Sequence, residues 1–270
     1  MTKNETTPDI AILMPHYNAF EALKRSLRSL ESDKPGRYDV VVVDDGSADP
    51  PDEETLQTCS RAIREVKVLR LPRNMGIETA LNTGLDYIYE QGYSYIARLD
   101  CGDLCLHDRL QKQHAFLETD PHIAMVGSWA KMVGKRGSFI FRPPVNPDEI
   151  AKKIYINNPF VHPAVMFRTA MIRQIGHYPL RFPAAEDYAF FFEIVRRFPT
   201  ANLPEVLLAY EINDDGISLS RRSRQIRSRI RVILNYFDFS PYAFYGLFRN
   251  LLLLALPYKL VETIKRMKNR

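Results

Sequence analysis

The segment Tyr38–Asp44, with the sequence YDVVVVD, decides the fold class. A short, unbroken and β-branched apolar run is typical of a strand that is covered on both faces. A second apolar run, Asp9–Pro15, precedes it, and the intervening Ala19–Glu31 has its apolar residues at helical spacing. Strand, helix and strand form a βαβ unit, so we predict that the two strands are parallel.

The alternation of strands and helices continues along the chain. We expect a helix over Asp52–Glu65, a strand over Val66–Leu71, a helix over Gly76–Gln91 and a strand over Tyr93–Leu99. Farther on, the pattern indicates helices at Asp108–Glu118 and Glu186–Phe198 and strands near Ile123–Val133 and Glu205–Tyr210. The prediction is an α/β fold with an open, mostly parallel sheet and a crevice at the carboxyl ends of its strands.

The charge of the chain is unevenly distributed. The 270 residues carry a net charge of +5, but residues 216–270 hold twelve Lys and Arg against Asp238 and Glu262. The remaining residues hold 25 basic against 30 acidic groups. An acidic body argues against a protein that coats nucleic acid, so we expect no nucleic-acid partner, and the basic tail favours contact with an anionic surface.

The three cysteines, Cys59, Cys101 and Cys105, give no disulfide framework, which indicates a reducing compartment. Cys101 and Cys105 have only His107 and His114 nearby, so a zinc site is a much weaker interpretation. The first eight residues lack the apolar core of a signal peptide.

Polar clusters follow each of the first four predicted strands. They are Pro15–Asn18, Asp44–Ser47, Arg73–Gly76 and Asp100–Asp103. In a parallel sheet these strand ends lie along one edge and above one crevice, so we expect the clusters to meet. The alternative is that Asp, Asn and Gly only make turns there.

These clusters suit a nucleoside diphosphate. The Asp45 carboxylate could accept a hydrogen bond from a base or a ribose hydroxyl, Tyr17 offers a face for stacking, and Gly46 lets the backbone approach closely. Asp100 and Asp103 could gather oxygen ligands around Mg²⁺ or Mn²⁺, which would neutralise the diphosphate. The chain has neither a dinucleotide fingerprint nor a phosphate-binding glycine loop, so metal and side chains would hold the phosphates.

Residues 9–220 resemble the inverting family 2 glycosyltransferases of bacterial surface-polysaccharide synthesis, which have the GT-A fold. The motifs that carry the resemblance are ILMPHYNA (Ile12–Ala19), VVVDDGSAD (Val41–Asp49), RNMGIETALNTGL (Arg73–Leu85), YIARLDCGDLCLHDRLQKQ (Tyr95–Gln113), NPFVHPAVMFR (Asn158–Arg168) and AEDYAFFFEI (Ala185–Ile194). The resemblance implies transfer of a sugar, commonly from a UDP-sugar, to a hydroxyl of a glycan or lipid-linked acceptor.

The resemblance also implies roles for individual residues. The residues expected to bind the donor nucleotide sugar are Pro15, Tyr17 and Asp45, which match base-binding positions, together with Asn18, Gly46, Asn74, Gly76 and Asp100. Asp100 and Asp103 match the ends of a D-x-D-D metal motif. His162 falls in a loop near the active site, and we include it among the binding residues as an acceptor-side contact.

Asp187 matches the general base, with Glu186 beside it in the catalytic set. Both residues open a predicted helix, whose dipole favours an ionised carboxylate, and a base that takes a proton must start ionised. The alternative is that the pair only caps the helix after Pro183.

Two motifs depart from the family pattern. Gly102 replaces the middle carboxylate of D-x-D-D, and Tyr210-Glu211-Ile212-Asn213 replaces Tyr-Arg-x-His. These changes leave open a catalytically inactive relative that only binds a nucleotide sugar. A nucleotidyltransferase is the other enzymatic alternative, but the loop after the first strand is neither Gly-rich nor basic.

The chain divides, on this interpretation, into a catalytic domain over residues 1–220 and a helical tail over residues 221–270. Residues 9–103 would bind the donor and residues 104–220 would face the acceptor. Six arginines between 221 and 231, an aromatic stretch and a basic end make the tail typical of an interfacial segment. We therefore expect a cytoplasmic protein on the inner face of the cell membrane; a helix pair packed on the domain, or a dimer interface, is the alternative.

Overall fold

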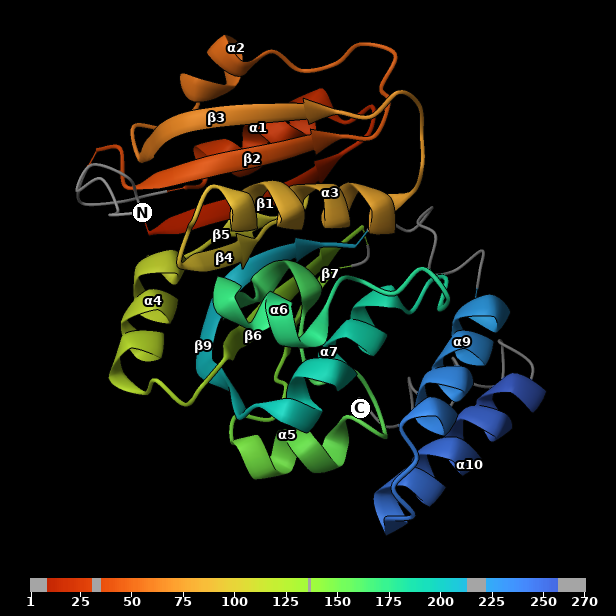
Figure 1. Ribbon diagram of the computed structural model, residues 1–270. Coiled ribbons are helices and arrows are strands. Elements are labelled where there is room, and N and C mark those ends of the chain that lie inside the picture. The colour runs from red at the N-terminus through yellow and green to blue at the C-terminus, as the bar shows by residue number, and fades with distance from the viewer. Residues whose placement is uncertain (1–8, 31–34, 136, 213–221, 257–270) are drawn as a thin grey trace.

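One curled sheet runs through the whole molecule (Figure 1). The computed structural model describes residues 9–30, 35–135, 137–212 and 222–256. In these residues the strand order is β3-β2-β1-β4-β8-β6-β9-β5, with β7 paired to β6 outside this path. Three parts of the predictions lie outside the described residues: Asn213, the first tail arginine Arg221, and the basic end of the tail beyond Leu256.

The amino-terminal half is the predicted parallel unit. Its strands are β1 (Ile10–His16), β2 (Tyr38–Asp44), β3 (Ile63–Arg70) and β4 (Tyr95–Arg98), and its helices are α1 (Phe20–Arg28), α2 (Glu53–Gln57) and α3 (Ile77–Glu90). Strand β1 pairs in parallel with β2 and β4, and β2 pairs in parallel with β3. The carboxyl ends of all four strands therefore lie along one edge, as the sequence predicts.

The remaining elements extend this sheet with strands of mixed direction. The strands are β5 (Leu104–Cys105), β6 (Met125–Gly134), β7 (Gly137–Phe141), β8 (Met166–Arg168) and β9 (Thr200–Glu211). The helices are α4 (Arg109–Thr119), α5 (Pro147–Lys153), η1 (His162–Ala164), η2 (Thr169–Met171), α6 (Ile172–Ile175), α7 (Glu186–Arg197), α9 (Arg222–Asn235) and α10 (Pro241–Ala255). Strand β8 runs antiparallel to β4 and β6, whereas the long strand β9 runs parallel to β6.

The predicted helix over Asp52–Glu65 is wrong in extent. Asp52 caps α2 by accepting a hydrogen bond from the Thr55 amide at 2.7 Å, but the helix ends at Gln57. Residues from Ile63 onward pair with β2 instead, because Ile63 and Val66 reach the apolar face of the sheet there. Tertiary pairing overrides the local helical spacing.

Helices cover both faces of the central strands, which explains the unbroken apolar run in β2. Val41 and Val43 face a core shared with α3 and α7, whereas Val40 and Val42 face a core shared with α1, α2 and α4. Gly84 lets α3 approach the first of these faces closely, since a Cβ there would lie 2.2 Å from Leu13 Cδ1.

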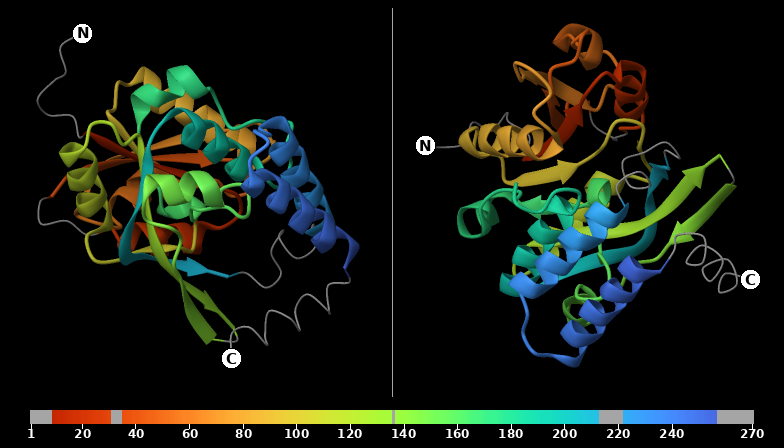
Figure 2. Two further views of the ribbon diagram at one scale, coloured as in Figure 1. Left: turned by 90° about the horizontal axis from the view of Figure 1, so that it is seen from below. Right: turned by 90° about the vertical axis from the view of Figure 1, so that its right-hand side faces the viewer.

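The tail helices pack on the catalytic body. Figure 2 shows α9 and α10 side by side against the second half of the molecule, and Val232, Ile233 and Ala243 belong to the same core as α7. The Tyr155 hydroxyl donates to the Tyr236 carbonyl at 3.0 Å. A helix pair packed on the domain, one of the two alternatives for the tail, is therefore what the structure shows.

One face of α10 nevertheless stays exposed. Its uncovered large side chains are Tyr242, Phe244, Tyr245, Phe248, Leu251 and Leu252. In the part of the chain that the structure describes, no helix has both the length and the apolar character needed to cross a membrane.

We predict that Gly84→Ala destabilises the protein. Alanine favours a helix over glycine by about 1 kcal/mol, but overpacking at Leu13 costs about 1–3 kcal/mol. Urea unfolding should show a lower midpoint. In a Leu13→Ala background, Gly84→Ala should lower the urea midpoint by less, because the clash with the Leu13 side chain is gone. A higher midpoint for Gly84→Ala alone would show that the close approach of α3 to the sheet is unimportant.

Candidate active site

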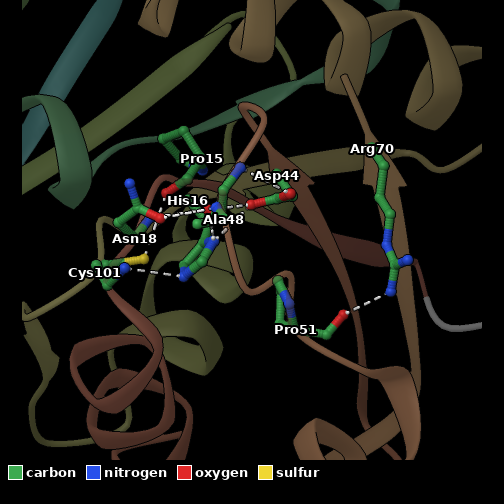
Figure 3. A network of polar contacts seen from close by, with 10 residues as sticks. Pro15, His16, Asn18, Asp44, Ala48, Pro51, Arg70 and Cys101 are labelled. Atoms are coloured by element: carbon green, nitrogen blue, oxygen red, sulfur yellow. Dashed lines mark hydrogen bonds and ion pairs between the residues drawn. The ribbon is translucent and has the colours of Figure 1, made fainter. Parts of the chain in front are cut away.

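The loops after β1 and β2 are joined by a polar network (Figure 3). The Nδ1 atom of the buried His16 ring lies 2.9 Å from Asp44 Oδ1. Asn18 adds two bonds, since its amide donates to Ser47 Oγ at 2.8 Å and its Oδ1 accepts from the Ala48 amide at 3.0 Å. These contacts fix the first two polar clusters of the sequence relative to each other.

The loop after β2 also holds the loop after β3. Asp45 is buried, and its two carboxylate oxygens accept the amides of Met75 at 2.7 Å and Gly76 at 3.0 Å. Gly46 has φ +75°, and a Cβ there would lie 2.3 Å from the Arg73 backbone. Asp45 thus shapes the loop after β3 through its backbone, and its remaining lone pairs could accept further hydrogen bonds.

The other candidate donor residues line the edge of these loops. Tyr17 is 48% exposed and Asn18 and Asn74 are also exposed, so all three are free to meet a ligand. The Pro15 carbonyl accepts the Cys101 thiol at 3.3 Å, which joins the loop after β1 to the loop after β4 (Figure 3). The four strand-end clusters therefore do come together.

Arg98 is a fully buried guanidinium beneath this edge, at the end of β4. It donates to the Leu13 carbonyl and to Asp100 Oδ1, and its Nε lies 3.4 Å from His162 Nε2. A buried charge needs such partners, because an unpaired one is strongly destabilising. Arg98 thereby orients Asp100 at the crevice.

His162 lies behind Asp100 as part of this arrangement. Its Nε2 is 2.9 Å from the Tyr178 hydroxyl, and its ring also packs against Phe191. Burial, reinforced by the nearby Arg98 charge, lowers the pKa of His162 to about 3, so the ring is neutral near pH 7. His162, which we predict as a binding residue, is therefore a neutral ring that contacts Arg98 and Tyr178.

Asp103 is buried with one unsatisfied oxygen. Its Oδ1 accepts the Glu211 amide at 2.8 Å, whereas Oδ2 has no hydrogen-bond partner among the described residues. Burial and the charge of Asp100 raise the pKa of Asp103 to about 8. A divalent cation would offset the repulsion and give Asp103 Oδ2 a partner, so Asp100 and Asp103 are the pair that could hold one.

Across the described ranges, no group of three or more His, Cys, Asp or Glu side chains has an arrangement that could hold a metal ion. The structure gives the zinc interpretation of Cys101 and Cys105 no support, since the Cys101 thiol bonds to Pro15 and both thiols have pKa values raised by burial.

The two departures from the family motifs meet in space. Gly102 has φ +102°, and a Cβ there would lie 2.6 Å from Glu211 Oε2. Glu211 pairs with Arg25 of α1, whose Nη2 would be 3.4 Å from the same Cβ. An ion pair thus fills the space that a side chain at position 102 would enter, so the glycine and the glutamate form one local arrangement.

Asp187 lies at the start of α7, where Asn158 Nδ2 donates to its Oδ2 at 2.9 Å. Burial raises the pKa of Asp187, while the Tyr188 amide, the Arg229 guanidinium and the Asn158 amide oppose the rise. Burial and the Asp187 charge raise the pKa of Glu186 to about 8. A pKa of about 8 keeps Glu186 protonated near pH 7.

The capping alternative accounts for only part of this pair, because Asp187 Oδ1 accepts the Tyr188 amide of the first turn at 2.7 Å. Ala185 is the N-cap residue of α7, and it makes no side-chain capping hydrogen bond. Glu186 and Asp187 occupy the first turn, and Glu186 Oε2 is buried without a partner among the described residues. The Glu186 carboxyl group is therefore held at a cost that helix capping does not explain.

Sequence reasoning missed several residues of this site. It gave no role to Arg98, although an arginine within the apolar strand Tyr95–Arg98 is a usable signal of a buried charge beside Asp100. It also gave no role to Asn158, and Arg25 and Arg229 approach the site from α1 and α9, so only the tertiary structure identifies them.

Comparisons with known proteins identify the family of the chain. Residues 11–176 match the family model described as glycosyl transferase family 2. The chain is 28% identical over 229 residues to the amylovoran biosynthesis glycosyltransferase AmsE of Erwinia amylovora, covering 82% of this chain and 83% of AmsE. It is 25% identical over 192 residues to an Escherichia coli UDP-Gal:alpha-D-GlcNAc-diphosphoundecaprenol beta-1,3-galactosyltransferase, covering 69% of this chain and 67% of that enzyme.

The fold is shared with a solved structure as well. S. aureus TarS 1-349 in complex with UDP-GlcNAc matches with a TM-score of 0.65 at 22% identity, covering 90% of this chain and 71% of that one. This likeness shows the GT-A type of fold that the sequence predicts. The family match spans more than half of the chain, and the chain therefore belongs to glycosyl transferase family 2 and is a glycosyltransferase.

Proposed function

We propose that this glycosyltransferase moves a sugar from a UDP-sugar to a hydroxyl of a lipid-linked glycan, with inversion at the anomeric carbon. The observation that carries the proposal is the convergence of four strand-end loops on one edge of the sheet. Asp187, which accepts a hydrogen bond from Asn158, lies near enough to Asp100 for the Asp100 charge to raise its pKa. The similarity to a galactosyltransferase whose name specifies a diphosphoundecaprenol acceptor supports the choice of acceptor class.

The donor would lie across the strand ends. Tyr17 would stack on the base, and Asn18, Gly46, Asn74 and Gly76 would line the nucleotide, while Asp45 holds the loop that contacts it. Asp100 and Asp103 would hold Mg²⁺ or Mn²⁺, which supplies positive charge to the leaving diphosphate. A thermal-shift screen should show stabilisation by UDP with Mn²⁺ above that by other nucleoside diphosphates.

The acceptor hydroxyl would lose its proton to Asp187. An ionised carboxylate in a partly buried site is a stronger base than one in water, and it must lie within hydrogen-bond reach of the attacking hydroxyl. Glu186, protonated beside it, would hold the pair to a single negative charge. Positioning and charge stabilisation are then the main contributions of the protein to a transition state of oxocarbenium character.

We further propose that the protein works on the inner face of the cell membrane. The exposed face of α10 carries three aromatic side chains of at least 55% exposure, Phe244, Tyr245 and Phe248, and α9 next to it carries exposed arginines. Apolar side chains in the acyl boundary with cations among head groups are typical of interfacial helices.

We predict that Asp187→Asn lowers kcat by about 10²- to 10⁴-fold, because it removes the general base. UDP affinity should stay within about twofold of the wild type, since Asp187 lies outside the strand-end loops. UDP release would be measured with a panel of UDP-sugars and an undecyl diphosphate-linked N-acetylglucosamine acceptor.

Glu186→Gln is the matched variant for this test. It replaces a carboxyl group that is protonated near pH 7 with a neutral group of the same shape, so we expect a loss below about tenfold. If Glu186→Gln abolishes turnover and Asp187→Asn does not, the two roles are exchanged.

We also predict a pH effect for Asn158→Ala. The Asn158 amide stabilises the ionised form of Asp187, so its removal raises the pKa of Asp187. The rate requires the ionised base and increases with pH through that pKa, so the acid limb of kcat/KM should move up by about one pH unit. Asn146→Ala, at an exposed position before α5, is the control; an unmoved acid limb in Asn158→Ala would count against Asp187 as the base.

Vesicle flotation tests the membrane proposal. Phe244→Ser/Phe248→Ser/Leu251→Ser should weaken binding to phosphatidylglycerol vesicles by at least about tenfold, since each side chain would lose apolar burial. The control Phe139→Ser/Leu180→Ser changes exposed apolar side chains elsewhere. Equal flotation of the wild type and the triple variant would reject α10 as the contact surface.

A further inference from the structure

Two arginines of the tail helices converge on the loop that precedes the catalytic region. Arg229 of α9 donates to Asn157 Oδ1 at 3.0 Å, and Arg249 of α10 donates to the Ile156 carbonyl at 3.0 Å. Arg229 also lies over the ring of Tyr188, with its guanidinium carbon 5.2 Å from the ring centroid. The loop they share continues directly into Asn158, which holds Asp187.

The two guanidinium groups lie close enough to repel each other. Burial and the charge of Arg229 lower the pKa of Arg249. Neither group forms an ion pair with a carboxylate among the residues that the structure places, whereas Arg25, Arg64 and Arg197 each do. Two partly buried guanidinium groups that repel each other and form no direct ion pair carry positive charge that an anion bound between them would neutralise.

The surroundings of the pair specify the kind of anion. On one side lies Asp187, which Arg229 stabilises electrostatically. On the other side, the exposed residues Tyr245, Phe248 and Leu252 flank Arg249 on the surface of α10. A ligand that fits has an apolar chain, then a phosphate group, then a sugar that points toward the base. Figure 1 shows α9 and α10 on the side toward which β2 and β3 point, so such a ligand would approach the donor edge.

We propose that Arg229 and Arg249 form a binding site for the phosphate or diphosphate group of a lipid-linked acceptor. The inference rests on the proposed function and adds to it the residues that select an anionic, lipid-borne acceptor. Planar guanidinium groups bind phosphate oxygens in pairs, and two of them match a diphosphate better than a single cation does. The aromatic face of α10 would take the start of the lipid chain.

Farnesyl diphosphate is a suitable probe, because it carries the diphosphate and a short apolar chain without a sugar. Its binding would be measured by calorimetry in the presence of saturating UDP and fixed free Mg²⁺, so that the donor site is already occupied. Arg229→Gln and Arg249→Gln should each weaken binding by about tenfold or more, as expected for loss of a hydrogen bond to a charged group. Farnesol should bind weakly to all variants alike.

Arg231→Gln is the matched control, since it removes the same charge from the same helix at an exposed position. Arg229→Lys is a second variant that keeps the charge and should lose less affinity than Arg229→Gln. UDP binding in every variant, measured separately, reports whether the fold and the donor site are intact. Failure of the wild type to bind UDP would count against the proposed function and not against this site.

Three outcomes would overturn the proposal. Equal affinity of wild type, Arg229→Gln and Arg249→Gln for farnesyl diphosphate would show that the pair does not bind the phosphate. A loss of the same size in Arg231→Gln would show a general charge effect. Loss of binding to phosphatidylglycerol vesicles, with farnesyl diphosphate affinity unchanged, would show that the pair meets phospholipid head groups and not the acceptor.

Discussion

The buried guanidinium of Arg98 is the interaction on which the arrangement of the two halves depends. It bonds to the Leu13 carbonyl in β1, to the Asp100 carboxylate at the end of β4 and to His162 in the second half of the chain. A cation without solvent must keep such partners, and a shift of the strand-end loops relative to η1 would break the contact of Arg98 with His162. Burial keeps His162 neutral, and the same charge adds to this effect, because a protonated ring beside Arg98 would be repelled.

Much of the amino-terminal half could be predicted from the sequence, because the patterns that indicate its strands and helices are local. The apolar runs of β1 and β2 and the helical spacing of α1 and α3 give the parallel unit, and parallel pairing brings the polar strand ends together. The roles of the ends were harder to predict. Asp45 was expected to face a ligand, yet both its oxygens first hold the backbone of Met75 and Gly76, a use that depends on a loop from another strand.

The rest depended on contacts between distant parts of the chain. Gly102 and Glu211 looked like two separate losses in the sequence, but they are neighbours, and Arg25 of α1 completes the arrangement. A substitution at either position therefore changes the space and charge of the other, so the motifs cannot be judged one at a time. The short α2 has the same cause, since pairing with β2 takes Ile63 and the residues after it into β3.

The tail shows most clearly why a boundary drawn from composition differs from a boundary drawn from packing. Charge and aromatic content set residues after 220 apart, but Tyr236 stacks on Phe192 of α7 with ring centroids 5.2 Å apart, and Val232 and Ile233 complete the same core. Helix α7 begins with Glu186 and Asp187, the two carboxyl groups proposed for catalysis. The same helix therefore carries the proposed base at its start and packs against the tail. A surface bound by α10 would have a fixed orientation relative to Asp187. If α10 binds the membrane that holds the acceptor, only the sugar of that acceptor still has to be positioned at Asp187.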